Sequence, residues 1–452
     1  MGIITLQQAA QWCGGRIDEK YKDISFLGAN MDTRKLEKGQ LFVALQGVRD
    51  GHDFIPAALE KGAAAVLCTH CDGDYPAIVV EDTRIALGMI ARGERQRLGV
   101  KVVGITGSVG KSTTKEMTFA VLETTYRVSK TPVNHNNDIG MPMAILAMPE
   151  DTQVAVLEMG MNHFREIAYL TDIAKPDIGV IVNIGTMHIE HLGSREGILK
   201  AKLEIREGMD EDGKLVLNGD DALLWGQRDD LSNVTYFGLE NENCQVLGSN
   251  VTLGEETAEF TASFGGESAK VCLPLTGIHN VSDALAAIGV GMHMGVTPEN
   301  ICRALSCFRN MESRQEILET EKYTIIKDCY NAGPESMAAS LTVLKSRKGR
   351  RIAVLGDMLE LGNCSAAEHY KVGRLAAETA DMLFAYGPNS GKMQKGAITG
   401  GMPHNKAFAY EDRSRLVSAL KQQARSGDVL LFKGSRGMRM ELALEQFLKE
   451  EE

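Results

Sequence analysis

The sequence predicts an α/β protein of three domains. The chain has 452 residues, which at about 150 residues per domain is enough for three. Apolar runs of strand length alternate with helical patterns, and this alternation is typical of parallel sheets covered by helices. We place the domains at residues 1–98, 99–313 and 314–452 from shifts in this pattern.

The central domain shows the clearest alternation. Its expected strands are Val100–Thr106, Val154–Glu158 and Asp177–Gly185. Its expected helices are Thr113–Arg127, Phe164–Ala174 and Arg195–Glu207. Residues 243–273 carry shorter alternating runs with glycines between them, which predict an antiparallel insertion.

The two flanking domains differ in regularity. Residues 1–98 mix short apolar runs with loops rich in glycine and aspartate, which indicates a small α/β domain. The last domain repeats the strand–helix alternation and is predicted to be a Rossmann-like α/β unit. Its expected strands are Tyr323–Cys329, Arg351–Gly356, Met382–Tyr386, Lys406–Tyr410 and Asp428–Phe432, and its last helix is Met438–Glu450.

Composition excludes several classes of protein. The net charge is −11 and the pI is near 5.5, which argues against a chain that coats nucleic acid. No apolar run reaches the roughly 18–20 residues of a membrane span, and the N-terminus does not have the pattern of a signal peptide. Nine scattered cysteines fit a reducing compartment, so we expect a cytoplasmic protein without membrane insertion.

The most informative segment is Val102–Glu116, VVGITGSVGKSTTKE. A strand ends in a glycine-rich turn, and Gly110-Lys111-Ser112 then opens a helix, as in a P-loop that binds the phosphates of a nucleoside triphosphate. The ordinary motif has a glycine where Ile105 stands, so the spacing is compact. The alternative is a plain glycine-rich turn between strand and helix.

Acids and histidines follow two neighbouring strands. Glu158 ends a strand that should point at the ligand crevice, where its carboxylate could bind Mg²⁺. His188 and His191 follow the next strand, and Lys200 and Lys202 lie on the helix after it. From spacing alone, ordinary loop histidines and solvated lysines are the favoured interpretation.

Four segments in this order, TGSVGKST, LEMGMN, NIGTMHIEHLGS and AKLEI, resemble the central domain of the Mur ligases. These enzymes build the peptide stem of bacterial cell-wall precursors, and the compact loop spacing is the form typical of the family. The resemblance implies a central P-loop ATPase domain with parallel strands.

Segments of the flanking domains narrow the resemblance. DTRKLEKGQLFVALQGVRDGHDFI, KDCYNAGPESM, AVLGDMLELG and LFKGSRGMRME are similar to the family member that joins D-alanyl-D-alanine to UDP-N-acetylmuramoyl-tripeptide. The DNPR signature of the ligase that adds the third stem residue is absent. The implied reaction passes through an acyl phosphate to the pentapeptide precursor, ADP and phosphate.

The resemblance also implies roles for individual residues. It puts Lys111 at the γ-phosphate, Ser112 and Glu158 on one Mg²⁺, and His188 with Lys202, carbamylated by CO₂, on a second ion. The further ATP contacts that it implies are Thr106, Gly107, Ser108, Val109, Gly110, Thr113, Asn136, Asn137, His279, Asn280, Arg314, Asp328 and Asn331. The implied contacts with the nucleotide sugar and the dipeptide are Asp32, Thr33, Arg34, Asp50, Tyr330, Lys433, Ser435 and Arg436.

Some of these assignments have structural alternatives. His279-Asn280 could be a simple helix cap, and Asp32-Thr33-Arg34 and the Lys433–Arg436 segment could be structural turns. Asp283 stands where the family usually has asparagine, and Gly333 stands in the family's YNANP segment.

Two other functions compete with this interpretation. One is a folylpolyglutamate-type or cyanophycin-type ligase with the same central domain, and the other is a regulatory P-loop NTPase. We expect a monomer whose partners are ATP, UDP-N-acetylmuramoyl-tripeptide and D-alanyl-D-alanine. Lysine and diaminopimelate both remain open as the third stem residue.

Overall fold

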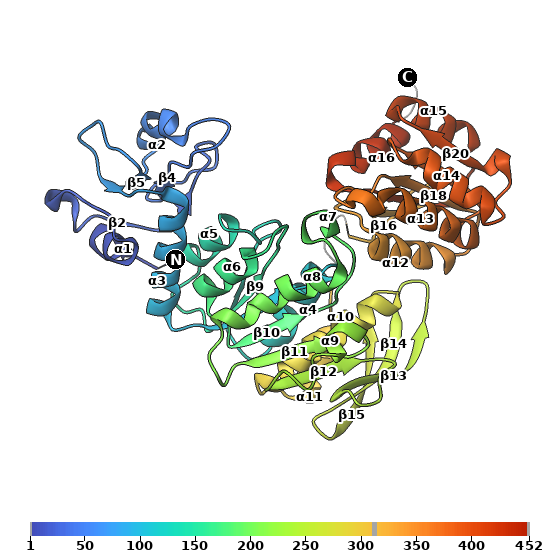
Figure 1. Cartoon of the computed structure of the whole chain (residues 1–452), viewed down its shortest axis with the longest axis horizontal. Coiled ribbons are helices and arrows are strands. Elements are labelled where there is room, and N and C mark those ends of the chain that lie inside the picture. Colours follow the sequence, from blue (N-terminus) through green and yellow to red (C-terminus); the bar gives the residue numbers. More distant parts are fainter. Residues whose placement is uncertain (1, 310–313, 450–452) are drawn as a thin grey trace.

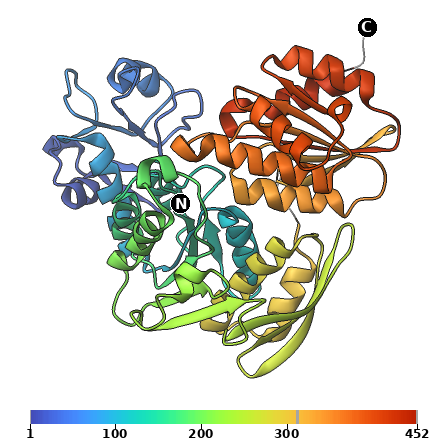
Figure 2. The ribbon, with the colours of Figure 1, turned by 45° about the vertical axis from the view of Figure 1, so that its right-hand side comes forward.

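The computed structural model describes residues 2–309 and 314–449, which form three α/β units (Figure 1). Figures 1 and 2 both show the N-terminal and C-terminal units beside the central one, joined to it at different places. The predicted boundary at residue 313 lies outside the described residues. Across the described ranges, no helix is long and apolar enough to cross a membrane.

The N-terminal unit is a small parallel sheet with helices around it. Its strands run in the order β3-β4-β5-β6, and β1 and β2 pair separately. The strands are β1 (Ile4–Thr5), β2 (Ser25–Phe26), β3 (Ala29–Asn30), β4 (Leu41–Val43), β5 (Ala65–Cys68) and β6 (Ala77–Val79). The helices are α1 (Leu6–Cys13), α2 (Ile55–Glu60) and α3 (Thr83–Leu98).

Helix α3 connects this unit to the central one. Asp82 caps its first turn by accepting hydrogen bonds from the backbone N–H groups of Arg84 and Ile85. Buried side chains of α3, among them Ile90, belong to an apolar cluster that continues from β4 and β5 into the central unit. The two units therefore share a hydrophobic core.

The central unit is built on one large sheet in the order β15-β14-β13-β12-β11-β10-β7-β9-β8. The pairs from β8 to β13 are parallel, and the last three strands are antiparallel to one another. The strands are β7 (Lys101–Thr106), β8 (Val128–Lys130), β9 (Val154–Glu158), β10 (Ile178–Ile181), β11 (Lys214–Asn218), β12 (Val234–Gly238), β13 (Val246–Leu253), β14 (Ala258–Phe264) and β15 (Glu267–Leu273).

Helices cover this sheet and position the site. They are α4 (Lys111–Glu123), α5 (Gly140–Leu146), α6 (Glu166–Ala174), α7 (Ile189–Leu192), α8 (Arg195–Leu203), α9 (Ala222–Trp225), α10 (Ile278–His293) and α11 (Pro298–Ser306). The predicted antiparallel insertion is confirmed, and it extends the edge of the parallel sheet because β13 pairs in parallel with β12.

The C-terminal unit has its own sheet in the order β16-β17-β21-β18-β19-β20. All pairs are parallel except β16 with β17. The strands are β16 (Glu316–Glu319), β17 (Tyr323–Asp328), β18 (Arg351–Gly356), β19 (Met382–Tyr386), β20 (Ala407–Tyr410) and β21 (Asp428–Lys433). The helices are α12 (Pro334–Lys345), α13 (Ser365–Thr379), α14 (Ser390–Thr399), α15 (Arg413–Gln423) and α16 (Met440–Leu448).

Several predicted boundaries were wrong for local reasons. The strand predicted to reach Gly185 ends at Ile181, because the residues after it turn to hydrogen-bond with the glycine-rich loop. The predicted last helix is broken at Arg439, whose positive φ of 50° separates a short 3₁₀ turn from α16. Glu450, its predicted end, lies outside the described residues.

Candidate active site

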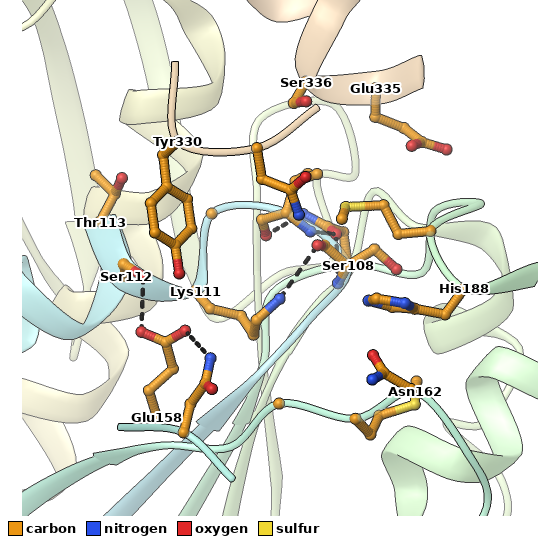
Figure 3. A pocket seen from close by; sticks show the side chains of 18 of the residues that line it. Ser108, Lys111, Ser112, Thr113, Glu158, Asn162, His188, Tyr330, Glu335 and Ser336 are labelled. Atoms are coloured by element: carbon orange, nitrogen blue, oxygen red, sulfur yellow. Dashed lines mark hydrogen bonds between the residues drawn. The ribbon is translucent and has the colours of Figure 1, made fainter. Parts of the chain in front are cut away.

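A cleft of about 1110 Å³ lies where the three units meet. Its walls include Arg84 from α3, the loops after β7, β9 and β10, and the residues after β17. Ligands of α/β proteins bind at the carboxyl ends of parallel strands, and the central sheet presents those ends to this cleft. Figure 3 shows side chains from the central and C-terminal units facing one another across it.

The glycine-rich loop follows β7 and ends at Gly110, where φ is 83°. A Cβ atom at this position would lie 2.5 Å from Asp283 Oδ1, so only glycine fits there. Lys111 then starts α4, and its Nζ donates to the carbonyl oxygens of Gly107 (2.8 Å) and Ser108 (3.2 Å). The lysine therefore lies over the loop at the start of a helix, where backbone N–H groups favour an anion.

Asn183, in the loop after β10, holds the glycine-rich loop in shape. Its Oδ1 accepts from the backbone N–H groups of Ser108 (3.1 Å) and Val109 (3.0 Å), and its Nδ2 donates to Val109 O (3.1 Å). Ser108 Oγ in turn accepts from Gly185 N at 2.9 Å. Sequence reasoning missed Asn183 as a site residue, although it opens the NIGTMHIEHLGS segment.

Ser112 and Glu158 form the acidic side of the site. Ser112 Oγ donates to Glu158 Oε2 at 2.6 Å, and Asn136 Nδ2 donates to Glu158 Oε1 at 3.0 Å (Figure 3). Burial opposes ionisation of Glu158, but Lys111, Ser112, Lys115 and Arg314 outweigh it and lower its pKa. A hydroxyl and an ionised carboxylate side by side are suitable oxygen ligands for Mg²⁺.

Lys115 supports this carboxylate from below. The fully buried ammonium donates to Thr131 O at 2.8 Å and lies 3.9 Å from Glu158 Oε2. Thr131 Oγ1 also accepts from Glu158 N at 3.0 Å. Lys115 was not among the predicted site residues.

His188 lines the cleft, and its side chain is neither fully exposed nor fully buried. It has a positive φ of 64°, and its Nδ1 lies 2.6 Å from Glu360 Oε2 of the C-terminal unit. The hydrogen bond to His188 is the main cause that lowers the pKa of Glu360. The interpretation of His188 as a solvated loop histidine is therefore not supported, because its side chain is 17% exposed and paired.

Lys202 is buried, with a relative exposure of 3%. Burial, with a smaller effect of Lys111, holds the pKa of its ammonium well below the usual range for lysine. Within the part of the chain that the structure describes, no hydrogen bond or ion pair joins its Nζ to another residue. The solvated-lysine interpretation was thus wrong for Lys202, whereas Lys200 on the same helix is exposed.

Arg314 and Gln315, which precede β16, line the cleft together with the glycine-rich loop. The Arg314 guanidinium lies 4.0 Å from the centre of the Tyr330 ring, and Gln315 hydrogen-bonds to His279 (2.8 Å) and Asn280 (3.2 Å) at the start of α10. Burial lowers the pKa of His279. Asn280 also donates to Thr276 O at 2.7 Å. The two hydrogen bonds of Gln315 therefore attach it to the central unit.

Asp283 lies one turn further along α10, beneath the loop. Thr114 Oγ1 donates to its Oδ1 at 3.1 Å. Burial raises the pKa of this carboxyl group to about 8, opposed by the Thr114 hydrogen bond and by Arg314. At neutral pH the carboxyl group is therefore protonated, and like an asparagine amide it is uncharged and can donate a hydrogen bond.

Residues of the C-terminal unit form a buried polar group at the ends of β17 and β21. Lys433 Nζ donates to Asp328 Oδ2 at 2.6 Å and to Asn331 O at 3.2 Å. Ser435 Oγ donates to Ala332 O at 3.0 Å. Arg436 lies outside this buried group: its side chain is exposed and pairs with Glu441 at 2.9 Å. These contacts order the loops at the strand ends, and both the structural-turn and the substrate-binding interpretations stay open.

The predicted residues of the N-terminal unit lie elsewhere. Asp32 accepts two bonds from the Arg34 guanidinium and one from its backbone N–H, which lower the pKa of Asp32 to about 2. Asp50 accepts from His52 N at 3.0 Å. Both acids therefore organise turns, and the Arg34 side chain is 87% exposed.

The cleft brings together most of the predicted residues of the central unit and several of the C-terminal unit. Those that line it are Ser108, Val109, Gly110, Lys111, Ser112, Thr113, Asn136, Asn137, Glu158, His188, His279, Asn280, Arg314, Asp328, Tyr330, Asn331 and Lys433. Those that do not are Asp32, Thr33, Arg34, Asp50, Thr106, Gly107, Lys202, Ser435 and Arg436.

Glu335 is a second lining residue that sequence reasoning missed. It follows the YNAGP segment, and its Oε1 accepts from Thr186 Oγ1 of the central unit at 2.9 Å. Its Oε2 is buried and has no hydrogen-bond partner within the described ranges.

No three His, Cys, Asp or Glu side chains of the described residues group as a metal site, so metal binding here would need ligands of other kinds, such as Ser112 or a modified lysine.

Comparison with known proteins agrees with this geometry. Three family models match the chain: "Mur ligase family, catalytic domain" at residues 23–95, "Mur ligase middle domain" at 105–291, and "Mur ligase, glutamate ligase domain" at 313–436. The UDP-N-acetylmuramoyl-tripeptide–D-alanyl-D-alanine ligase of Bacillus subtilis is 41% identical over 447 residues, 97% of this chain and 96% of its own. The Escherichia coli ligase of the same name is 36% identical and covers 97% of each chain.

Solved structures give the same result. A crystal structure of MurF from Acinetobacter baumannii superposes with a TM-score of 0.92 at 30% identity, covering 100% of both chains. MurF ligase from Thermotoga maritima in complex with ADP gives a TM-score of 0.82 at 29% identity, covering 93% of this chain and 96% of that one. The motifs, the fold and the full-length relatives all agree: this chain belongs to the Mur ligase family.

Proposed function

We propose that this protein is an ATP-dependent ligase that joins D-alanyl-D-alanine to UDP-N-acetylmuramoyl-tripeptide and forms the pentapeptide precursor of the cell wall. The observation that carries the proposal is the cleft itself, in which Lys111 and the Ser112–Glu158 pair face residues of the C-terminal unit. Relatives that bear this activity in their names cover nearly the whole chain.

The chemistry divides into two steps. The terminal carboxylate of the tripeptide attacks the γ-phosphorus of ATP, which forms an acyl phosphate and releases ADP. The amine of the dipeptide then attacks the acyl carbon, loses a proton, and displaces inorganic phosphate as the amide forms. Both steps move negative charge between oxygens, so fixed cations and hydrogen-bond donors lower the barriers.

Lys111 and the glycine-rich loop act in the first step. Burial lowers the pKa of Lys111, opposed by Glu158, and its Nζ already lies over the loop at 2.8 Å from Gly107 O. A phosphate group at the start of α4 would offer Nζ a stronger partner than a neutral carbonyl oxygen. We therefore expect Lys111 to turn from the loop to the γ-phosphate.

The residues present fit two divalent ions, as the family implies. Ser112 and Glu158 would hold one, since they already share a hydrogen bond of 2.6 Å. Lys202 is buried without a recorded partner among the described residues, and its pKa is well below the usual range. A neutral amine can add CO₂, and the resulting carbamate, with His188, would supply oxygen and nitrogen ligands to the second. When bound, the ions would neutralise phosphate oxygens.

The N-terminal and C-terminal units would bind the two other substrates. The N-terminal unit carries Arg34, whose exposed planar guanidinium suits a pyrophosphate. The C-terminal unit would present the dipeptide, and residues such as Tyr330 and Asn331 would take part because they line the cleft. All nine cysteines are free thiols, which fits the proposal of a monomer in the reducing cytoplasm.

Release of inorganic phosphate tests this proposal and its competitors together. We expect release only when ATP, the nucleotide tripeptide and D-alanyl-D-alanine are all present, with one phosphate per amide. A folylpolyglutamate-type ligase would require glutamate and a folate in their place. A regulatory NTPase would release phosphate from ATP alone, and that result would contradict the proposal.

Lys111→Ala provides the inactive control for this assay. We expect it to lose at least about 100-fold in turnover, whereas Lys101→Ala, which changes an exposed lysine at the start of β7, should behave as wild type. Equal activity of the two variants would exclude Lys111 from the phosphate site.

A further inference from the structure

The LGDMLELG segment, Leu355–Gly362, has no role in the chemistry described above. It leaves the end of β18, and most of its side chains point into the C-terminal unit. Asp357 is buried and accepts from the backbone N–H (3.0 Å) and Nδ2 (2.9 Å) of Asn389. Met358 and Leu361 lie in the apolar core of this unit.

Backbone hydrogen bonds fix the same segment. Met358 N donates to His369 Nε2 at 2.9 Å, and Leu359 N donates to Ser435 Oγ at 2.9 Å. Ser435 N returns a bond to Asp357 O at 3.0 Å. The loop is therefore rigid, and the two side chains that it turns outward are Leu359 and Glu360.

Glu360 reaches across the boundary between the units to His188, at 2.6 Å from Oε2 to Nδ1. The two residues have unusual backbone conformations, with φ of 62° and 64°. Non-glycine residues adopt this region rarely, and those that do cluster at functional sites. Beside them, a Cβ on Gly362 would lie 3.1 Å from Glu190 Cβ, so the C-terminal and central units are in close contact there.

The contact with Glu360 decides which ring nitrogen of His188 is available to bind a ligand. When Nδ1–H donates to the carboxylate, Nε2 carries the lone pair and can serve as an acceptor or a ligand. Figure 3 shows the ring of His188 directed into the cleft. Glu360 comes from a different unit from His188, so this orientation exists only while the two units are in contact.

We propose that Glu360 is a positioning residue that orients His188 toward the metal and phosphate side of the cleft only when the C-terminal unit has closed on the central unit. The proposal rests on the proposed function, because it assigns the LGDMLELG segment a task in that site. Assembly of the site is then coupled to closure, which brings the dipeptide to the acyl phosphate.

Binding of Mn²⁺ tests the proposal without relying on turnover. The probe is Mn²⁺ with ADP, and the free ion is measured by electron paramagnetic resonance on the full-length protein. Glu360→Ala should weaken the binding of one ion by about 10–100-fold, the usual cost of losing a carboxylate that orients a ligating histidine. Glu378→Ala, which removes an exposed acid from α13 of the same unit, should bind like wild type.

Glu360→Gln separates positioning from folding. Its amide oxygen can still accept from Nδ1–H, so we expect it to recover most of the lost affinity, to within about fivefold of wild type. In the ligase assay both variants should lower kcat and leave the KM for ATP within about twofold. Melting curves that overlay wild type show that the fold is intact.

Unchanged Mn²⁺ affinity in Glu360→Ala, or equal losses in the Ala and Gln variants, would overturn the proposal. Failure of the proposed function would look different: wild-type protein would then release no phosphate with the nucleotide tripeptide and the dipeptide. The Mn²⁺ comparison between wild type and Glu360→Ala would still decide the role of Glu360.

Discussion

The N-terminal unit shares a continuous apolar core with the central unit, whereas the C-terminal unit meets it through polar side chains. Ile90 of α3 and Met141 of α5 belong to the same buried cluster. The two core clusters of the C-terminal unit contain, among the described residues, only side chains from that unit. Its contacts with the central unit include His188–Glu360 and Thr186–Glu335.

This difference indicates which of the three units move together and which one moves separately. Separating the first two units would expose apolar area to water at about 25 cal/mol per Å², so we expect them to move as one body. Polar contacts exchange protein partners for water at little net cost. We therefore expect the C-terminal unit to open and close, as an enzyme that must admit a second substrate requires.

The largest effect should come from Lys202, which is buried on α8 of the central unit. Lys202→Ala should reduce turnover by about 100–1000-fold with little change in melting temperature, and short carboxylic acids should restore part of it by replacing the carbamate. Lys200→Ala, exposed on the same helix, is the matched control. Full activity of Lys202→Ala would show that Lys202 has no part in the reaction.

Ile90 probes the apolar boundary. Ile90→Ala should lower the free energy of unfolding by about 2–5 kcal/mol, because its side chain is fully buried in the apolar cluster that the two units share. Met89→Ala, an exposed neighbour on α3, should cost far less. Calorimetry is the measurement, and we expect the loss in the transition that includes both units. A loss confined to the N-terminal unit would contradict the shared core.

Asp283, in the central unit, predicts how the stability of the protein depends on pH. Its pKa is about 8 in the folded protein and near 3.9 when unfolded, so folding takes up a proton and stability falls as pH rises through this range. Asp283→Asn cannot titrate. Its melting temperature should rise relative to wild type by a few °C between pH 5 and pH 8.5 and stay level above that. A difference that does not depend on pH would contradict the assignment.

The smallest effect should come from the ion pair between Lys348 and Glu255, which also joins the central and C-terminal units. The distance is 3.0 Å, but the side chains are 91% and 44% exposed. Exposed pairs contribute about 0–1 kcal/mol, so Lys348→Ala should leave turnover and melting temperature unchanged. A loss comparable to that of Glu360→Ala would mean that closure depends on many contacts and not on Glu360.

The sequence predicted the parts of the fold and site that depend on local pattern. The strands Val154–Glu158, Arg351–Gly356 and Met382–Tyr386 have the predicted bounds, because buried parallel strands are continuous apolar runs. The sequence also singled out Lys111, Ser112 and Glu158, which line one cleft, because strand ends and helix starts are visible in a sequence. β16, a short and partly exposed edge strand, was missed.

Contacts between distant segments could not be predicted in this way. Asn183 and the glycine-rich loop are about 75 residues apart along the chain, and Glu360 lies 172 residues from His188. Their partners depend on how the units pack, and nothing in the spacing of either segment encodes it. The burial of Lys202 likewise follows from the packing of α8, which left the solvated interpretation open until the structure was known.

Transfer of oxygen from the tripeptide tests the central claim most directly. The tripeptide carboxylate is labelled with ¹⁸O, and the products of one round of ligation are analysed by mass spectrometry. An acyl phosphate requires one labelled oxygen to appear in inorganic phosphate for each amide formed, with ADP as the nucleotide product. Unlabelled phosphate, or label in AMP, would show that the carboxylate never attacks the γ-phosphorus and would contradict the account.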